Sequence, residues 1–172
     1  MTILWTTSSV MRFPYAYAVS LVQVDPEALW AVGFRGMIVD VDNTLLGFDD
    51  SELAPPVLQW IATAQKRGFR MVILSNNFPE RVAAMAARLG CPGIPNALKP
   101  LPFAYWRALR LLGLRSVETV MLGDQLMTDI LGAQLLGIRG ILLNPIAQKD
   151  FPLTRVLRCV ESWLVGGKRP QG

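Results

Sequence analysis

The segment from Met37 to Leu45 constrains this chain most, because an apolar run ends there in two acids one residue apart. Its sequence is MIVDVDNTL, in which Asp40 and Asp42 are the acids. Met-Ile-Val is apolar without alternation, which is typical of a strand buried on both faces. Asp40 would then lie at the carboxyl end of the strand, where open parallel sheets bind ligands. Residues i and i+2 of an extended chain point the same way, so the two carboxylates would converge. The segment therefore indicates a metal site, an acid/base pair, or both.

The composition narrows the chemistry that this pair can support. The chain has no histidine, which excludes a Ser-His-Asp triad and zinc bound by histidine. Acid/base work then falls to carboxylates, and the expected metal is one that prefers oxygen ligands. The 172 residues are 52% hydrophobic and 17% charged, with a net charge of +4, which favours anionic partners. Cys91 and Cys159 form no CxxC pair, and we expect both to be reduced.

Apolar strand patterns alternate with helical patterns along most of the chain. Such alternation predicts an α/β fold, with a central parallel sheet and helices on both faces, in one domain over residues 1–172. Asp25 and Pro26 form a helix start, and glycines follow several helical patterns at the C′ position. We expect strands at 37–39, 69–74, around 94, 117–122 and 139–143, and helices from 26 and over 57–67, 79–89, 103–112 and 128–136.

Two terminal segments admit two interpretations each. Residues 1–24 are apolar and aromatic, and they either pack on the core or anchor the chain at a membrane interface. Residues 150–172 contain an amphipathic pattern over 154–164 with basic side chains, and a net charge of +3 from Lys149 onward. That pattern fits a helix lying on an anionic membrane and equally a terminal helix docked on the sheet. No run is long and apolar enough to predict a transmembrane helix.

Polar residues follow four of the predicted strands. Besides the first pair, these are Ser75 with Asn76, Lys99, and Asp124 with Asp129. Each alone has an ordinary explanation as a helix cap, a turn residue or a solvated lysine. Their occurrence in order at strand ends of one α/β chain favours a shared ligand site, since ligands collect at that edge.

These residues carry a resemblance to the haloacid dehalogenase (HAD) superfamily of phosphohydrolases. The chain is similar to it in Asp40-Val-Asp42-Asn-Thr44-Leu, Ser75, Lys99-Pro100 and Gly123-Asp124-Gln-Leu-Met-Thr-Asp129, over about residues 36–144. The residues within these motifs resemble those of the capless subclass IIIA, in the group with YqeG-like proteins and phosphatidylglycerophosphate phosphatases. The resemblance implies a three-layer HAD-like Rossmannoid fold without a cap domain.

The resemblance also implies a role for each residue in magnesium-dependent phosphoryl transfer. Asp40 would attack phosphorus and form an aspartyl-phosphate, and Asp42 would act as general acid and base. Mg²⁺ would bind the Asp40 carboxylate, the Asp42 backbone carbonyl and Asp124, while Asp129 would act from the outer shell or through water. Thr44 would support the loop geometry.

Three further residues would hold the phosphoryl group. The resemblance assigns its oxygens to Ser75 and the Asn76 amide, and charge neutralisation to Lys99. The intervals between the motifs are too short for a cap domain, so the site would be open and a large substrate would help to cover it.

The preferred hypothesis is a magnesium-dependent phosphatase that makes phosphatidylglycerol from phosphatidylglycerophosphate, an anionic phospholipid, at a membrane surface. The protein would be cytoplasmic and peripheral at the inner face of that membrane. Its alternatives are a phosphatase of a soluble ester, a phosphoprotein or a polynucleotide end, and a non-enzymatic module that binds RNA or protein. The complete set of motifs disfavours the last, and nucleic acid is not the expected partner.

Overall fold

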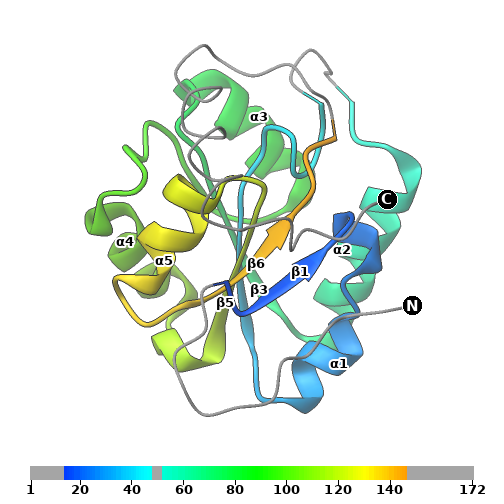
Figure 1. Ribbon diagram of the computed structural model, residues 1–172. Helices are drawn as coiled ribbons and strands as arrows, with labels where there is room; N and C mark the ends of the chain where they lie inside the picture. Colours follow the sequence, from blue (N-terminus) through cyan, green and yellow to red (C-terminus); the bar gives the residue numbers. More distant parts are fainter. Residues whose placement is uncertain (1–13, 48–51, 147–172) are drawn as a thin grey trace.

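The computed structural model of this protein describes residues 14–47 and 52–146 as a parallel sheet between two layers of helices (Figure 1). All strand pairs are parallel, and the strand order is β1-β6-β5-β2-β3-β4. β2 therefore lies inside the sheet, between β5 and β3. The strands are β1 (Ala16–Ala18), β2 (Gly36–Val39), β3 (Arg70–Leu74), β4 (Gly93–Ile94), β5 (Thr119–Gly123) and β6 (Arg139–Leu143).

The helices begin and end at the residues that the sequence marks. Asp25 Oδ1 accepts a hydrogen bond from the Glu27 N–H at 2.9 Å, so Asp25 caps the first helix. Pro55 and Pro79 open two others, and Gly68 and Gly90 follow them with φ of 108° and 63°, a region that glycine enters without strain. The helices are α1 (Pro26–Ala31), α2 (Pro55–Arg67), α3 (Pro79–Leu89), α4 (Pro102–Leu112) and α5 (Leu131–Gln134), with 3₁₀ turns η1 (Leu21–Gln23) and η2 (Ser116–Glu118).

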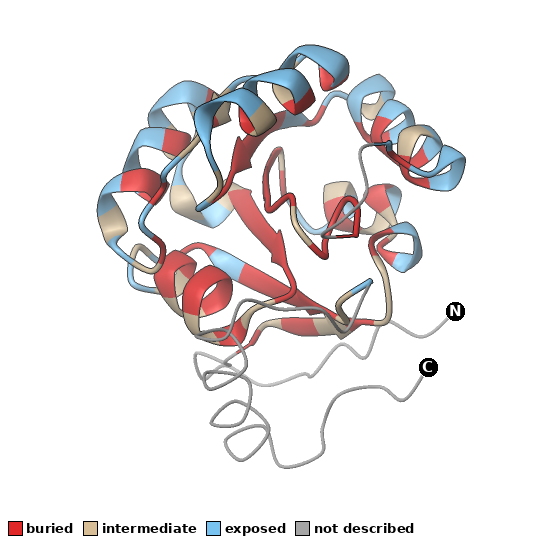
Figure 2. Cartoon of the chain, turned by 90° about the horizontal axis from the view of Figure 1, so that it is seen from above, coloured by how far each residue is buried: buried red, intermediate tan, exposed pale blue. Residues whose placement is uncertain are grey.

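Each face of the sheet is covered by its own apolar cluster. Helices α1, α2 and α3 pack on one face through residues such as Leu29, Ile61 and Val82, and α4 and α5 pack on the other through Tyr105 and Ala133. Figure 2 shows the buried sheet in the middle, with the exposed sides of the helices around it. Because both faces are covered, the central strands read as continuous apolar runs.

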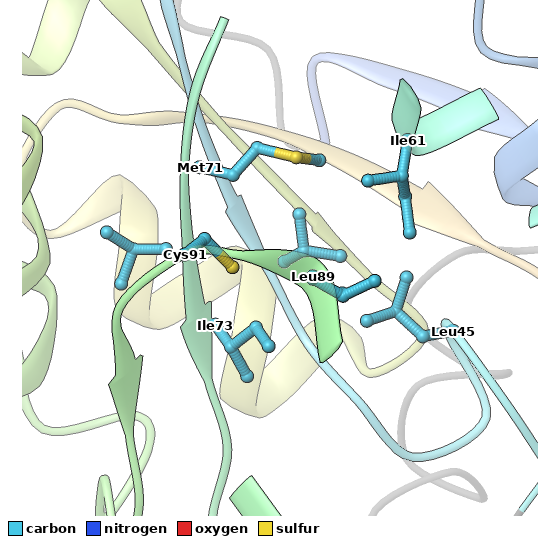
Figure 3. A pocket seen from close by; sticks show the side chains of 8 residues that line it. Leu45, Ile61, Met71, Ile73, Leu89 and Cys91 are labelled. Carbon is cyan, nitrogen blue, oxygen red and sulfur yellow. The ribbon is translucent and has the colours of Figure 1, made fainter. Parts of the chain in front are cut away.

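A narrow apolar pocket lies within the first of these layers, between the sheet and helices α2 and α3 (Figure 3). Ile61, Met71 and Leu89 line it, and the side chain of Cys91 points into it. This lining contains no charged group. The pocket is therefore part of the apolar packing between the sheet and its helices.

Two elements differ from the sequence-based prediction. Residues 16–18, within the segment expected to pack on the core or anchor at a membrane, form the edge strand β1 beside β6, with Ala16 and Ala18 buried. The helix predicted over 128–136 is instead a π-helical turn, η3 (Leu126–Ile130), followed by the short α5. The other predicted strands and helices are present, with ends that shift by two residues or fewer.

Some of the predicted features fall on residues that the structure does not describe. The C-terminal helix expected over 154–164, Cys159 and residues 1–13 lie outside the described ranges. Within those ranges, no helix combines the length and apolar character needed to cross a membrane.

Candidate active site

The predicted site residues meet at the carboxyl edge of the sheet. Asp40 follows β2, Ser75 follows β3, Lys99 lies in the loop after β4, and Asp124 follows β5. Because these strands are parallel neighbours, their ends meet at one edge, as the sequence predicts. Asp40, Ser75, Lys99 and Asp124 are all buried, so the site is set into this edge.

Lys99 is the centre of the buried part of this site. Its Nζ atom lies 2.6 Å from Asp40 Oδ1 and 2.6 Å from Asp129 Oδ1. The side chains of Lys99, Asp40 and Asp129 are 3%, 4% and 0% exposed in these pairs. Both contacts are charge-assisted hydrogen bonds in a region of low dielectric, where such bonds are strong. Lys99 is thus a fixed cation held against the predicted nucleophile.

Burial and charge shift the pKa of each partner in a definite direction. Burial raises the pKa of Asp40 well above its usual value, and Asp129 and Asp124 add to the rise while Lys99 opposes it. Burial acts to lower the pKa of Lys99, but the negative charges of Asp129 and Asp40 reverse this and leave that pKa raised. Lys99 is therefore held as a cation, whereas burial disfavours the ionised form of Asp40.

Three buried carboxylates lie close enough together to hold a cation. Asp40, Asp124 and Asp129 each place one oxygen within 4.8 Å of the others. An all-oxygen set suits Mg²⁺ or a similar hard ion, so the donor chemistry fits a divalent metal. The carboxylate of Asp42 is not in this group, which is consistent with the prediction that Asp42 offers its backbone carbonyl. That role stays a prediction.

The π-helical turn η3 places Asp129 beside Lys99. Its wide turn puts Asp129 Oδ2 in position to accept a hydrogen bond from the Gln125 N–H at 3.1 Å, while Oδ1 contacts Lys99. A Cβ at Gly123 would overlap the Asp129 carboxylate, so glycine is required there. The Tyr105 hydroxyl donates to the Thr128 carbonyl at 2.6 Å and supports the turn from α4. Asp129, predicted to act from the outer shell, is the direct counterion of Lys99.

Asp42 lies in a different environment from Asp40, although only one residue separates them. Its Oδ2 accepts a hydrogen bond from Asn77 Nδ2 at 3.1 Å, and its Oδ1 accepts one from Arg81 Nε at 3.1 Å. The Asp42 side chain is 19% exposed and that of Arg81 is 30% exposed. The second acid is thus held at the outer edge of the site and stays within reach of solvent.

The loops after β3 and β4 form one hydrogen-bonded unit. The Asn76 side chain accepts from the Lys99 N–H at 2.8 Å, and Ser75 Oγ accepts from the Asn77 N–H at 3.1 Å. The Ser75 hydroxyl can still donate its own proton, so the predicted bond to a phosphoryl oxygen stays possible and stays a prediction. Asn76, predicted to hold phosphate through its amide, also fixes the loop that carries Lys99. The buried Thr44 hydroxyl has no hydrogen-bond partner among the described residues, which fits a residue placed to meet a ligand or water.

Sequence reasoning missed two residues of this site. Asn77 and Arg81 both contact Asp42, and neither was assigned to the site from the sequence. The signal was present, since Arg81 lies in the first turn of a helix that begins just after a site loop. Nothing in the spacing shows that this arginine turns toward the loop after β2, because that depends on how α3 packs.

Comparison with known proteins places the chain in a family. The profile of the haloacid dehalogenase-like hydrolases matches residues 16–137. The chain is a haloacid dehalogenase-like hydrolase. It is 34% identical over 159 residues to a probable phosphatase of Bacillus subtilis (strain 168), YqeG, and the match covers 92% of each chain. It is also 28% identical over 165 residues to the chloroplastic phosphatidylglycerophosphate phosphatase 1 of Chlamydomonas reinhardtii, covering 90% of this chain and 61% of that one.

Solved structures confirm the fold. An uncharacterized protein from Corynebacterium glutamicum matches with a TM-score of 0.54 and 24% identity, over 78% of this chain and 94% of that chain. Between β3 and β4 the chain inserts only α3, and no cap domain is present in the described part of the molecule. The described part of this hydrolase therefore matches the capless type, and the predicted site residues lie at the edge of its sheet.

Proposed function

We propose that this hydrolase is a Mg²⁺-dependent phosphomonoesterase that works through an aspartyl-phosphate and acts on phosphatidylglycerophosphate at a membrane surface. The observation that carries the chemistry is the contact of Lys99 with both Asp40 and Asp129, next to Asp124. A buried nucleophilic carboxylate, a fixed cation and an oxygen-rich metal cluster at one point are the parts that phosphoryl transfer requires.

The first half-reaction uses the two acids in separate roles. An oxygen of Asp40 attacks phosphorus, the bond from phosphorus to the leaving oxygen breaks, and Asp42 gives its proton to that oxygen. Lys99 and the Ser75 hydroxyl stabilise the charge on Asp40 and on the phosphoryl oxygens. In the second half-reaction Asp42 takes a proton from water, the water oxygen attacks phosphorus, and the bond to Asp40 breaks.

A divalent cation fits the cluster of Asp40, Asp124 and Asp129, and Mg²⁺ is the ion that we propose. When bound, it supplies positive charge that orients the phosphoryl group and favours the ionised form of Asp40. Lys99 alone does not offset the effect of burial on Asp40, because the pKa of Asp40 stays raised despite the contact.

The proposal of a lipid substrate is supported by other observations than the proposed reaction. One relative is named a phosphatidylglycerophosphate phosphatase, and the described chain has no cap to enclose a small substrate. A lipid that stays in its bilayer needs a site that reaches the surface, and Asp42 with Arg81 forms a partly exposed rim. A soluble ester, a phosphoprotein or a polynucleotide end would also fit an open site, but no contact in the structure favours one of them.

The direct test is phosphate release from phosphatidylglycerophosphate in detergent-mixed micelles, with Mg²⁺ and with EDTA. We expect release with Mg²⁺ only, and loss of at least about 10³-fold for Asp40→Asn, because the nucleophile is removed. Equal turnover by Asp40→Asn would refute the aspartyl-phosphate. Turnover of a soluble ester, a phosphoprotein or a polynucleotide end with none of the lipid would refute the substrate.

A further inference from the structure

We infer that the loop–helix rim beside the active site is a membrane-docking surface that lays the site against an anionic bilayer. The rim consists of Phe78, Leu98, Leu101, Phe103 and Trp106, together with Arg107 and Arg110 of α4. The inference rests on the proposed lipid substrate, and it assigns membrane contact to residues outside the two terminal segments that the sequence suggested.

The rim gathers the exposed aromatic side chains of the described residues. Phe78 is 73% exposed, Phe103 is 76% exposed and Trp106 is 56% exposed. Leu98 and Leu101, also exposed, lie on either side of Lys99. Leaving large apolar side chains in water is unfavourable, and exposed apolar surface beside a site often marks a place of interaction.

The rim is held rigidly next to the catalytic groups. The Asn96 N–H donates to the Asn77 carbonyl at 3.0 Å, and the Ala97 N–H donates to the Ser75 carbonyl at 3.0 Å, so the two loops are joined by backbone hydrogen bonds. Leu98 has a φ of 52°, a left-handed conformation that is unfavourable for leucine. The fold thus accepts local strain at an apolar side chain that is exposed beside Lys99.

Helix α4 extends the rim with aromatic and basic side chains on one face. Phe103, Trp106, Arg107 and Arg110 are spaced at i, i+3, i+4 and i+7, and all are exposed. The Arg110 guanidinium lies 4.8 Å from the centre of the Trp106 ring. Tyr105 and Ala108 on the opposite face are buried against the sheet. An exposed helix face of aromatic and basic side chains is typical of binding at a membrane interface.

The charge of this region selects an anionic bilayer as the partner. From position 81 to 117 the chain has no acidic residue and six basic ones, namely Arg81, Arg88, Lys99, Arg107, Arg110 and Arg115. Lys99 is buried between two carboxylates, and Arg81 and Arg115 pair with acids outside this range, which leaves Arg88, Arg107 and Arg110 as the basic residues that carry the attraction. Helix α4, the loop before it and α3 from Arg81 onward fall within this range, and the exposed Glu80 lies just before it. Each basic side chain near an anionic leaflet adds to the attraction, which falls off within a Debye length. Apolar side chains at the edge and arginines beside them would place the site opening at the headgroup level.

The test compares vesicle binding by a rim variant and by a matched control. The rim variant is Phe78→Ser with Phe103→Ser. The control is Val117→Ser with Leu135→Ser, which removes two side chains that are each 61% exposed, just before the strands β5 and β6 begin, at the opposite edge of the sheet. Sedimentation is measured with phosphatidylcholine vesicles with and without about one-third phosphatidylglycerol, since surface charge drives the attraction.

We expect the full chain to bind the anionic vesicles and the rim variant to bind them about tenfold or more weakly, from the loss of two inserting rings. The control should stay within about twofold of the parent chain, because surface substitutions elsewhere have small effects. Arg107→Gln with Arg110→Gln should weaken binding and reduce its dependence on salt. Equal binding by the rim variant and the parent chain, or an equal loss in the control, would overturn the inference.

Two further measurements keep this inference separate from the proposed function. Lipid hydrolysis in detergent-mixed micelles tests the substrate without a bilayer, so failure there rejects the proposed function alone. Hydrolysis in vesicles should fall in the rim variant by the factor that its binding falls. If sedimentation velocity shows a dimer that Phe78→Ser with Phe103→Ser dissociates, while the parent chain ignores vesicles, the rim is a self-association surface and the membrane proposal is wrong.

Discussion

Replacing Lys99 by methionine tests the electrostatic core of the site, because this side chain faces two buried carboxylates. Each 2.6 Å contact has a gross attraction of about 6 kcal/mol at an effective dielectric constant of 20, and much of it repays desolvation. Breaking such a buried pair costs about 3–5 kcal/mol, since an uncompensated charge remains. We expect Lys99→Met to lose that much unfolding free energy at pH 8 in EDTA, measured by urea denaturation.

The pH dependence of this loss is the sharper signature. A carboxyl whose pKa is raised on folding adds stability below its unfolded pKa, and this stability is lost as the pH rises through its folded pKa. Lys99 lowers the pKa of Asp40, so the folded pKa of Asp40 is higher in the variant. The pH range over which stability is lost therefore extends to higher pH in the variant than in the parent chain. The difference from the parent chain should therefore shrink as the pH falls from 8 to 5, by up to about 1.4 kcal/mol per unit for one proton.

The exposed Lys66 supplies the control for this experiment. Lys66→Met, near the end of α2, should change the free energy of unfolding by less than about 0.5 kcal/mol at both pH values. If Lys99→Met stays within about 1 kcal/mol of the parent chain at pH 8, or the two pH curves run parallel, the ion pairs do not hold the site as argued.

Three other outcomes follow from the same structure. Asp40→Asn should raise the Tm in EDTA at pH 7.5, because burial has raised the pKa of this carboxyl and its ionised form costs stability; a lower Tm would contradict this. Gly123→Ala should displace the Asp129 carboxylate and lower the phosphatase rate at least about tenfold, which steady-state kinetics would measure. Burial raises the pKa of the Cys91 thiol to about 11, so peptide mass spectrometry at pH 7.5 should find iodoacetamide labelling there about 100-fold slower than in urea, and equal rates would refute it.

The sequence predicts most of the sheet but misses two local structures, for physical reasons. Continuous apolar runs identify β2, β3, β5 and β6, since both faces of the sheet are covered. The three residues of β1 are too few to show a period, and their strand exists only through pairing with β6. The turn η3 has helical periodicity in its sequence, but its wide π geometry coincides with the contacts of Asp129 to Lys99 and Gln125.

In the candidate site, the sequence spacing predicts which residues follow strands but not which side chains contact each other. Asp40, Ser75, Lys99 and Asp124 follow strands, so parallel topology alone predicts that they meet. The contacts of Asn77 and Arg81 with Asp42 depend on the rotation of α3 against the sheet, which no motif spacing contains. Long-range side-chain pairing of this kind becomes visible only in three dimensions.

The different surroundings of Asp40 and Asp42 explain how two like residues can carry different roles. Asp40 is buried against Lys99, so the proposed nucleophile is shielded from water and faces a fixed cation. Asp42 is partly exposed between Asn77 and Arg81, where it can exchange a proton with a leaving group and then with water. Pairs of acids whose environments differ in this way divide the work of nucleophile and proton carrier. Arg81 lies in the first turn of α3, three residues after Phe78, so the proposed proton carrier is close in sequence to the surface that we propose docks on the bilayer.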